Sequence, residues 1–236
     1  MLRSQNTIRE MNHKGYTAIF DIDSLVYQAC YSAEDLEEAI EGFFNRYDHA
    51  LYCLGNHVKI EKVIPVGFCT NNYRKKVDLS YKAHRPSRDE RPSFFDDLID
   101  HIKDNMNVQI RSGIETDDLV AKFYEYYGKD ETIIVSIDKD YRQFECNLYN
   151  YAKDTLEKIT GYEAYYNFME QMVIGDRADN VKPLKGYGPK WCDKNLAGKS
   201  DWGILRAVYS LYKAKYRSKA KEVYMRTYLL LKLNVF

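Results

Sequence analysis

The segment Tyr16-Thr17-Ala18-Ile19-Phe20-Asp21-Ile22 is a short apolar run that contains β-branched and aromatic residues. Its length and composition predict a buried β-strand. An acid stands near the end of the run, and Asp23 follows two residues after Asp21. Because a buried strand followed by acids recurs later in the chain, this segment sets the pattern from which the fold is predicted.

Helical and strand patterns alternate after this segment. The predicted elements are helices at 33–58, 94–106 and 116–127 and strands at 63–68, 132–137 and 148–152, the last at a sheet edge. Apolar residues at helical spacing mark the helices, and β-branched residues mark the strands. Such alternation is typical of crossover connections, so we predict an α/β fold with a central, mostly parallel sheet flanked by helices.

The second part of the chain has a different pattern. No strand pattern returns after about residue 160, and helices are predicted at 162–174, 189–196, 202–212 and 215–233. Residues 69–93 are polar, basic and interrupted by proline, which predicts a loop. The predicted domains are a lead-in segment at 1–14, an α/β core at 15–160 that includes this loop, and a helical region at 161–236.

Composition excludes several classes of protein. The five cysteines are odd in number and widely spaced, which argues against a disulfide framework or a zinc ribbon. No apolar run approaches the roughly 20 residues of a membrane span, and the polar first 14 residues do not resemble a secretory signal. We therefore expect a cytoplasmic protein with no membrane partner.

Acidic residues recur where predicted strands end and at two further places. These acids are Asp21, Glu115, Asp117, Asp118, Asp138, Asp140, Asp176 and Asp179. Ligands of an open parallel sheet bind outside the carboxyl ends of its strands, so we expect the acids to converge on one site. Like charges need cations to neutralise them, and hard oxygen ligands favour Mg²⁺ or Mn²⁺. The alternative, helix N-capping, accounts for single positions better than for doubled acids.

Residues 72–88 concentrate Arg and Lys with interleaved Tyr. Basic side chains contact phosphates and aromatic rings stack on unpaired bases, so the segment is a candidate nucleic-acid contact. The alternative is a solvated charged loop. The formal net charge of zero argues mildly against a polyanionic partner. If cations neutralise the eight acids, 35 basic residues face 27 acids, a balance of +8 that suits a polyanion.

The stretch Lys185-Gly186-Tyr187-Gly188-Pro189-Lys190 reads as a glycine turn that leads into a helix. Gly186 and Gly188 allow backbone conformations that are closed to other residues. Pro189 suits the first turn of a helix, whose free N–H groups would face an anion such as a phosphate. An ordinary turn between helices is the alternative. The position of the turn ten residues after Asp176 gives the phosphate interpretation its weight.

Together these stretches resemble the 5′-nucleases, the superfamily of flap endonucleases and 5′→3′ exonucleases, and look most like the stand-alone exonucleases of tailed bacteriophages. The matching stretches are 19–27, 73–76 with 81–85, 113–121, 135–144 and 175–190. They follow the order of the family and span most of the chain. The resemblance implies a PIN-like core and a helix-three-turn-helix at about 170–197 that grips duplex DNA and holds K⁺.

The resemblance also implies an activity and its site. It implies a monomeric nuclease with two Mg²⁺ or Mn²⁺ ions that cleaves DNA or RNA–DNA at a 5′ end, flap or nick, for primer removal or genome turnover in phage replication in the host cytoplasm. All eight acids would shape the metal site. Residues implied to act at the scissile phosphate are Lys82, Arg85, Tyr81 and Arg74, with Tyr81 stacking on the terminal base. Residues implied to bind DNA are Lys75, Lys76, Arg88, Lys185, Gly186, Tyr187, Gly188 and Lys190.

One stretch departs from the family pattern. The family has an Asp soon after the second strand, whereas residues 67–72 here (GFCTNN) contain no acid. Thr70 or Asn71 would then support a metal-bound water, and a DNA junction-binding protein without catalysis is a second hypothesis. A third is an aspartyl-phosphate phosphatase, because Asp21 and Asp23 form a D-x-D pair. That hypothesis lacks the expected Gly-Thr after the pair and leaves the basic segment unexplained.

Overall fold

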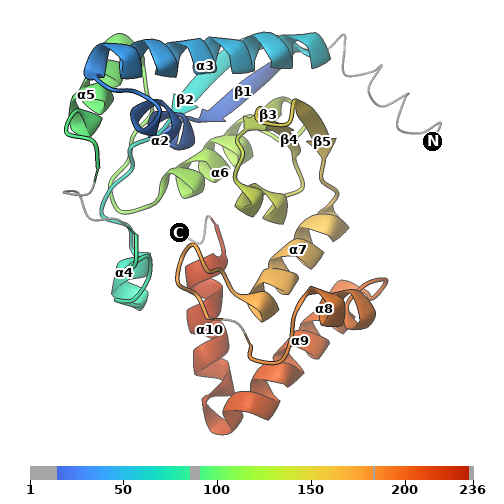
Figure 1. Ribbon diagram of the computed structural model, residues 1–236. Coiled ribbons are helices and arrows are strands. Elements are labelled where there is room, and N and C mark those ends of the chain that lie inside the picture. The colour runs from blue at the N-terminus through green and yellow to red at the C-terminus, as the bar shows by residue number, and fades with distance from the viewer. Residues whose placement is uncertain (1–14, 86–90, 183, 234–236) are drawn as a thin grey trace. The chain divides into compact units, whose positions relative to one another are not determined.

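The computed structural model describes residues 15–85, 91–182 and 184–233 (Figure 1). Their contacts define two units, each with its own hydrophobic core. Unit 1 comprises residues 15–71, 91–141 and 146–158, and unit 2 comprises residues 72–85, 142–145 and 159–233. The predicted lead-in segment at 1–14 lies outside the described residues.

Unit 1 is built on a five-stranded sheet with strand order β2-β1-β3-β4-β5. The strands are β1 (Gly15–Asp21), β2 (Lys59–Val66), β3 (Thr132–Val135), β4 (Asn147–Asn150) and β5 (Thr155–Lys158). The pairs β1–β2, β1–β3 and β3–β4 are parallel, and only β5 runs antiparallel, to β4. The prediction of a central, mostly parallel sheet is confirmed.

The interior position of β1, between β2 and β3, explains its continuous apolar sequence. Ala18 and Phe20 pack into the main core of unit 1, while Ile19 points to the opposite face and is equally buried. A strand covered on both faces reads as an unbroken apolar run instead of an alternating one. The carboxyl end of β1, at Asp21, is paired with the end of β2 at Val66.

Helices cover both faces of this sheet. They are α2 (Asp23–Tyr31), α3 (Leu36–His57), α5 (Phe95–Asn105) and α6 (Thr116–Tyr127). Residues of α2, α3 and α5 share the core with β1, and Figure 1 shows α3 on one side of the sheet and α6 on the other. The predictions of α3, α5 and α6 are confirmed to within a few residues. Helix α2 was not predicted, because its nine residues follow β1 with only one residue between them.

Two further details differ from the sequence-based expectation. Strand β4 was predicted at a sheet edge, but β5 pairs with it and takes the edge position. The basic segment was predicted as part of the α/β core, whereas its residues 72–85 pack within unit 2. They include a short helix, α4 (Arg74–Val77), and the buried ring of Tyr81.

Unit 2 is helical among its described residues. Its longer helices are α7 (Gly161–Ile174), α8 (Pro189–Asn195), α9 (Asp201–Tyr216) and α10 (Ala220–Leu231). Helix α7 begins with a capping box, in which the Thr160 amide donates to Glu163 at 2.8 Å and the Glu163 amide donates to Thr160 Oγ1 at 3.2 Å. The predicted helical region is confirmed. No described helix has both the length and the apolar character that crossing a membrane requires.

Candidate active site

The end of β1 places Asp21 in the interior of unit 1, where only 7% of its surface is exposed. Its Oδ2 accepts hydrogen bonds from the Tyr141 hydroxyl at 2.8 Å and from Ser136 Oγ at 3.4 Å. Burial raises the pKa of Asp21 to about 7, and the charges of Asp23 and Asp138 act in the same direction. The Tyr141 hydrogen bond partly opposes this shift. Asp21 is thus a buried acid surrounded by other acids.

Asp23 joins three segments at this end of the sheet. Its Oδ1 accepts from the Phe68 amide at 2.8 Å, and its Oδ2 accepts from Thr116 Oγ1 at 2.6 Å. The carboxylate therefore links the start of α2 to the segment after β2 and to the first turn of α6. The sequence suggests for Asp23 only a place in the D-x-D pair, because both of its partners lie far away along the chain.

Gly67 is needed beside Asp23 for steric reasons. A Cβ atom on this residue would lie 2.8 Å from Ile22 Cγ1 and 3.0 Å from Asp23 Oδ1. The first contact is closer than real Cβ atoms show, and the second is tighter than most of them, so a side chain here would push against Ile22 and the Asp23 carboxylate.

The acids at the start of α6 serve partly as helix caps. Asp118 is 1% exposed, and its Oδ2 accepts from the Glu115 amide at 3.2 Å. The Asp118 amide in turn donates to Asp117 Oδ1 at 2.7 Å. The N-capping alternative therefore accounts for part of this group. Asp117 is half-buried, and its negative charge helps to raise the pKa of Tyr141.

The acids after β3 are ordered by a chain of short hydrogen bonds. The Asp138 amide donates to Ser136 Oγ at 3.1 Å, and the Asp140 amide donates to Asp138 Oδ1 at 2.8 Å. Burial and then the charges of nearby carboxylates, Asp21 first among them, hold the pKa of Tyr141 well above its usual range. The pKa of the fully buried Tyr141 is thus raised by acids from three segments, namely β1, α6 and the loop after β3. It was not predicted as a site residue, although it directly follows Asp140.

The donor set of unit 1 fits a hard divalent cation. Among the residues that the structure describes, no three His, Cys, Asp or Glu side chains are grouped closely enough to hold one ion between them. Mg²⁺, however, retains several waters and commonly takes only one or two carboxylates from the protein. Burial and the charges of Asp23 and Asp138 disfavour the charged form of Asp21, and a divalent ion beside the carboxylate would favour that form.

Asp176 and Asp179 lie in unit 2, between α7 and α8. Asp176 Oδ1 accepts from the amides of Ala178 at 2.7 Å and Asp179 at 3.2 Å, so it orders its own turn. Asp179 instead accepts hydrogen bonds from Tyr81 and Arg85 of the basic segment and forms an ion pair with Lys82. Because the other six acids belong to unit 1, the predicted convergence of all eight stays a prediction.

The structure separates the predicted phosphate-contacting residues into two groups. Arg74 is fully buried, and its guanidinium donates to the carbonyls of Leu230 and Lys232, both at 3.0 Å. It thereby satisfies backbone groups at the end of α10. Tyr81 is 2% exposed, and its ring packs into the core of unit 2. Lys82 and Arg85 both contact Asp179.

The remaining predicted DNA contacts are placed as follows. Lys75, Lys76, Lys185 and Lys190 are exposed, while Arg88 lies outside the described residues. Gly186 has a φ of +94°, in the region that favours glycine. Gly188 has a φ of −147°, which any residue adopts, so of these two glycines Gly186 alone uses the conformational freedom of glycine. Pro189 opens α8 as predicted, and the Tyr187 ring meets the Trp191 ring edge-on at 5.3 Å.

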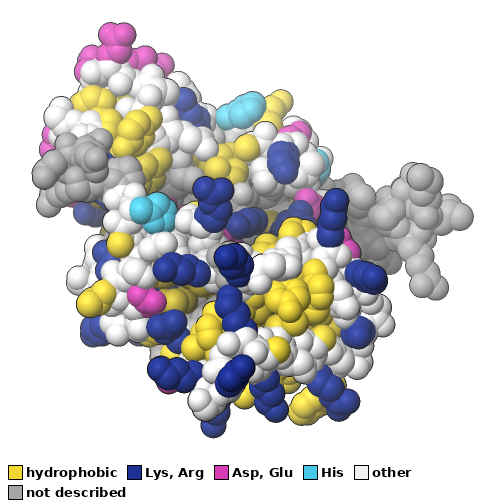
Figure 2. All heavy atoms as spheres, turned by 60° about the horizontal axis from the view of Figure 1, so that its bottom comes forward, with side chains coloured by type: hydrophobic (Ala, Val, Ile, Leu, Met, Phe, Trp, Pro, Cys, Tyr) yellow, Lys and Arg dark blue, Asp and Glu magenta, His cyan; other side chains and the backbone are white. Residues whose placement is uncertain are grey.

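Charge is divided unequally between the units. Unit 2 contains 20 basic and 9 acidic residues, a formal net charge of +11, which the rest of the neutral chain balances with −11. Figure 2 brings forward the side of the molecule that carries α8, α9 and α10, where Lys and Arg side chains are widespread and Asp and Glu side chains are sparse. The zero net charge of the chain therefore hides a strongly basic unit.

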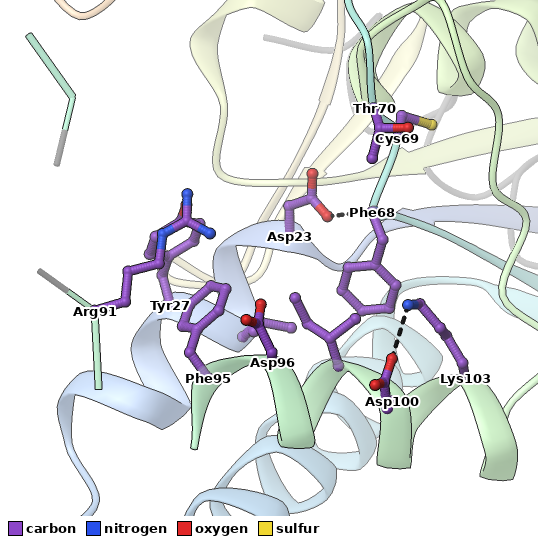
Figure 3. Close-up of a pocket in the computed structure, with 12 residues that line it drawn as sticks. Asp23, Tyr27, Phe68, Cys69, Thr70, Arg91, Phe95, Asp96, Asp100 and Lys103 are labelled. Atoms are coloured by element: carbon purple, nitrogen blue, oxygen red, sulfur yellow. Dashed lines mark hydrogen bonds and ion pairs between the residues drawn. The ribbon is translucent and has the colours of Figure 1, made fainter. Parts of the chain in front are cut away.

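A pocket of about 600 Å³ lies in unit 1 beside Asp23. Its walls include the rings of Tyr27, Phe68 and Phe95, and the Arg91 guanidinium lies over the Phe95 ring at 4.8 Å (Figure 3). Helices α2 and α5 and the segment after β2 form it, so the acid-free stretch 67–72 borders the pocket.

The acid-free stretch is fastened to residues 109–113. The Thr70 amide donates to the Arg111 carbonyl at 3.3 Å, and the Gly113 amide donates to the Thr70 carbonyl at 2.7 Å. Asn71 Nδ2 donates to Ser112 Oγ at 3.0 Å. The backbone of Thr70 and the side chain of Asn71 therefore hold the two loops together, and the support of a metal-bound water by Thr70 or Asn71 stays a prediction.

Comparison with known proteins gives a consistent result. No protein-family model matches the chain. It is 29% identical over 195 residues to DNA polymerase I of Treponema pallidum (strain Nichols), a match that covers 75% of this chain and 19% of the polymerase. The chain thus spans about a fifth of the length of that relative.

Solved structures extend the likeness over almost the whole chain. The flap endonuclease of bacteriophage T5, in a pseudo-enzyme–product complex with DNA and metal ions, aligns with a TM-score of 0.59 at 12% identity and covers 92% of this chain and 99% of its own. T5 5′-exonuclease with bound zinc ions aligns at 0.58, with 15% identity over 93% of this chain and 99% of its own. The catalytic core of Rad2 in complex with DNA substrate aligns at 0.56, with 15% identity over 90% of this chain and 72% of its own. The chain therefore has the fold of the 5′-nucleases, and the resemblance predicted from its motifs is confirmed.

Proposed function

We propose that this protein is a divalent-metal-dependent 5′-nuclease that hydrolyses phosphodiester bonds of DNA, or of RNA–DNA, at a 5′ end, flap or nick. The observation that carries the proposal is the buried Asp21 at the carboxyl end of β1, close to the charges of Asp23 and Asp138. Asp117 acts on Tyr141, which is hydrogen-bonded to Asp21. The fold supports it, since structures with this fold include nucleases bound to DNA and to metal ions.

The acids of unit 1 would hold the ions. The proposed ligands, directly or through water, are Asp21, Glu115, Asp117, Asp118, Asp138 and Asp140. When bound, Mg²⁺ or Mn²⁺ supplies an activated water and neutralises charge on the phosphodiester. Tyr141 and Ser136 orient the Asp21 carboxylate, and Asp23 fixes the start of α6 next to it. Two ions at this site, and a K⁺ at the turn between α7 and α8, belong to the same proposal.

The basic residues of unit 2 would act on the phosphates. Lys82 and Arg85 would stabilise negative charge that develops on the transferring phosphate. Lys75, Lys76, Lys185 and Lys190 would contact the DNA backbone, helped by the net charge of +11 of their unit. Arg74 and Tyr81 would act as structural residues, because their side chains are buried. Primer removal or genome turnover in phage replication is a role that fits such an enzyme.

A single substitution tests this function. Asp138→Asn should reduce cleavage of a labelled 5′-flapped duplex in Mg²⁺ by at least about a hundredfold while leaving duplex binding within about threefold, because it removes a ligand charge without touching unit 2. Asp104→Asn, an exposed acid near the end of α5, is the matched control and should cleave normally. Full activity of Asp138→Asn would contradict the proposal.

The acid-free stretch supports a second candidate function, a DNA junction-binding protein without catalysis. Residues 67–72 hold no carboxylate, and their polar groups fasten them to residues 109–113. The same flap assay distinguishes the two candidates. Tight binding with no product in either Mg²⁺ or Mn²⁺ would favour the binding protein, whereas any Asp138-dependent product would favour the nuclease.

A further inference from the structure

Helix α9 carries aromatic and basic side chains in alternation along one face. The residues of α9 that are buried in the core of unit 2 are Ile204, Val208 and Tyr212. A second series, at intervals of four, three and four residues, consists of Trp202, Arg206, Tyr209 and Lys213. Residues three or four apart are neighbours on a helix surface, so this series forms one continuous stripe, which we call the α9 stripe.

Trp202 begins the stripe and is exposed to an extent that is unusual for a tryptophan. About three quarters of its surface, 75%, is accessible to solvent. The Gly203 amide donates to Ser200 Oγ at 3.3 Å, and this cap fixes the first turn of α9. The indole therefore projects from an ordered helix. Leaving so large an apolar ring in water is unfavourable, and a planar partner that stacks on the ring would relieve this cost.

The second aromatic residue of the stripe, Tyr209, is held by contacts with its neighbours. Its ring meets the Tyr224 ring of α10 edge-on, with the centroids 5.4 Å apart. Lys213 Nζ lies 5.2 Å from the centroid of the Tyr209 ring, and Lys215 Nζ lies 5.3 Å from that of Tyr216. Each lysine thus keeps its charge beside an aromatic ring. The stripe presents positive charge and aromatic surface side by side.

The two helices around the stripe are strongly basic. Residues 201–232 contain eight basic and two acidic residues, a formal net charge of +6. Neither Arg206 nor Lys213 has an ion-pair partner among the residues that the structure describes. On the side of the molecule shown in Figure 2, apolar and aromatic side chains lie among Lys and Arg. A partner that complements this surface carries negative charge.

A single strand of nucleic acid matches both properties of the stripe. It offers unpaired bases to an exposed ring and a phosphate to each neighbouring cation. From Trp202 to Lys213 the stripe spans about 17 Å, which is the length of roughly five stacked nucleotides. A duplex keeps its bases inside, and an acidic protein segment supplies charge without a base. Neither of these partners would give Trp202 a stacked base.

We propose that the α9 stripe is a binding site for single-stranded nucleic acid, in which Trp202 stacks on a base while Arg206 and Lys213 contact phosphates. The residues assigned above to the DNA backbone, Lys75, Lys76, Lys185 and Lys190, all lie outside α9. The site goes beyond the proposed nuclease function, because binding a strand requires neither a metal ion nor cleavage.

The first test follows the fluorescence of Trp202 in EDTA. The chain has two tryptophans, so Trp191→Phe leaves Trp202 as the only reporter. Saturating oligo-dT of about 16 nucleotides should quench this fluorescence by about half or more, because a base stacks directly on the indole. A blunt duplex of the same length should quench it by less than about a tenth. Absence of quenching by oligo-dT would overturn the proposal.

The second test separates stacking from charge by the affinity for oligo-dT and its dependence on salt. Trp202→Ala should weaken binding by about tenfold or more without changing the salt dependence, since the lost contact is uncharged. Arg206→Gln should reduce the slope of log affinity against log salt by about 0.7, the value for one phosphate contact of a single strand. Trp202→Phe should keep the affinity within about threefold. Equal salt slopes for wild type and Arg206→Gln would contradict the phosphate contact.

Tyr52→Ala is the matched control for these variants. Tyr52 is an exposed aromatic residue of α3 in unit 1, with 72% of its surface accessible, and its loss should change oligo-dT affinity by less than about twofold. The Tm of Trp202→Ala should stay within about 2 °C of wild type, because the ring is exposed. A larger fall in Tm would show that Trp202 is a structural residue and would overturn its assignment to binding.

The third test asks whether the bases themselves are needed. An abasic strand of equal length keeps the phosphates, and it should bind wild type about tenfold or more weakly than oligo-dT does. Trp202→Ala should bind the abasic strand as well as wild type does. An equal loss of affinity for both strands would reject stacking. If polyglutamate quenches Trp202 as strongly as oligo-dT, the stripe is a site for an acidic protein segment and the proposal is wrong.

Failure of the proposed nuclease function would be recognised separately. All three tests are done in EDTA, so a wild-type protein without nuclease activity would still give their results. Conversely, an active nuclease in which Trp202→Ala leaves oligo-dT affinity unchanged would reject the α9 stripe while the proposed function stands.

Discussion

The Tyr141 hydroxyl donates a 2.8 Å hydrogen bond to Asp21 Oδ2, and both side chains are buried in unit 1. This bond stabilises the charged form of an acid whose pKa is nonetheless raised to about 7. Burial outweighs the hydrogen bond, and the charges of Asp23 and Asp138 add to the effect. The charged form of Asp21 therefore costs stability in the folded protein when no cation is bound beside it.

The first prediction concerns Asp21→Asn in EDTA. The pKa of Asp21 is higher in the folded than in the unfolded protein, so its favourable contribution is complete below the unfolded pKa and is lost as the pH rises through about 7. Asn does not ionise, so the Asp21→Asn variant does not lose this stability as the pH rises. We expect its free energy of unfolding to exceed that of wild type by about 1–4 kcal/mol at pH 8, with the difference vanishing near pH 4. Urea unfolding at both pH values measures it, and a difference independent of pH would contradict it.

The second prediction concerns metal binding without catalysis. Saturating Mg²⁺ should raise the Tm of wild type, because an ion that binds only the folded state stabilises it by mass action. At 100 times its Kd the gain is about 3 kcal/mol. Asp21→Asn should show less than about half of this shift, and Asp104→Asn should show all of it. Equal shifts in all three proteins would place the ion elsewhere.

The third prediction tests the close packing at Gly67. Gly67→Ala should lower the free energy of unfolding by about 1–3 kcal/mol, since the new Cβ would meet Ile22 and Asp23 at 2.8 and 3.0 Å. Gly55→Ala is the matched control, because a Cβ there meets no atom within 4 Å and the residue lies within α3. Gly55→Ala should leave the free energy of unfolding unchanged or raise it by up to about 1 kcal/mol. Urea unfolding measures the free energy of unfolding of both variants. Equal changes in Gly67→Ala and Gly55→Ala would reject the steric explanation.

The fourth prediction separates Arg74 from the cations that would contact phosphate. Arg74→Met should lower the free energy of unfolding by about 2–4 kcal/mol, because the carbonyls of Leu230 and Lys232 lose their donor inside the protein. The exposed neighbour Lys75→Met should cost less than about 0.5 kcal/mol. Chemical denaturation followed by tyrosine and tryptophan fluorescence compares them. A stable Arg74→Met variant with impaired DNA cleavage would instead restore the catalytic role predicted from the sequence.

Local patterns in the sequence suffice for much of the fold. The run at Tyr16–Ile22 and the period of α6 identify their elements because strand composition and helix periodicity are local properties. Helix α2 and strand β5 escape prediction. Helix α2 follows β1 with one residue between them, and β5 (Thr155–Lys158) is polar and lacks the apolar β-branched run of β3. Asp21 is predicted at a site because the ends of parallel strands share one edge of a sheet.

The partners of the site residues could not be read in the same way. Asp23 meets Thr116 across 93 positions, Tyr141 meets Asp21 across 120, and Tyr81 meets Asp179 across 98. No local pattern encodes such pairs, because they form only when separate elements pack together. The sequence thus identifies the chemistry available, acids at strand ends and a run of basic residues. Packing decides which of those groups is buried, which caps a helix and which holds another in place.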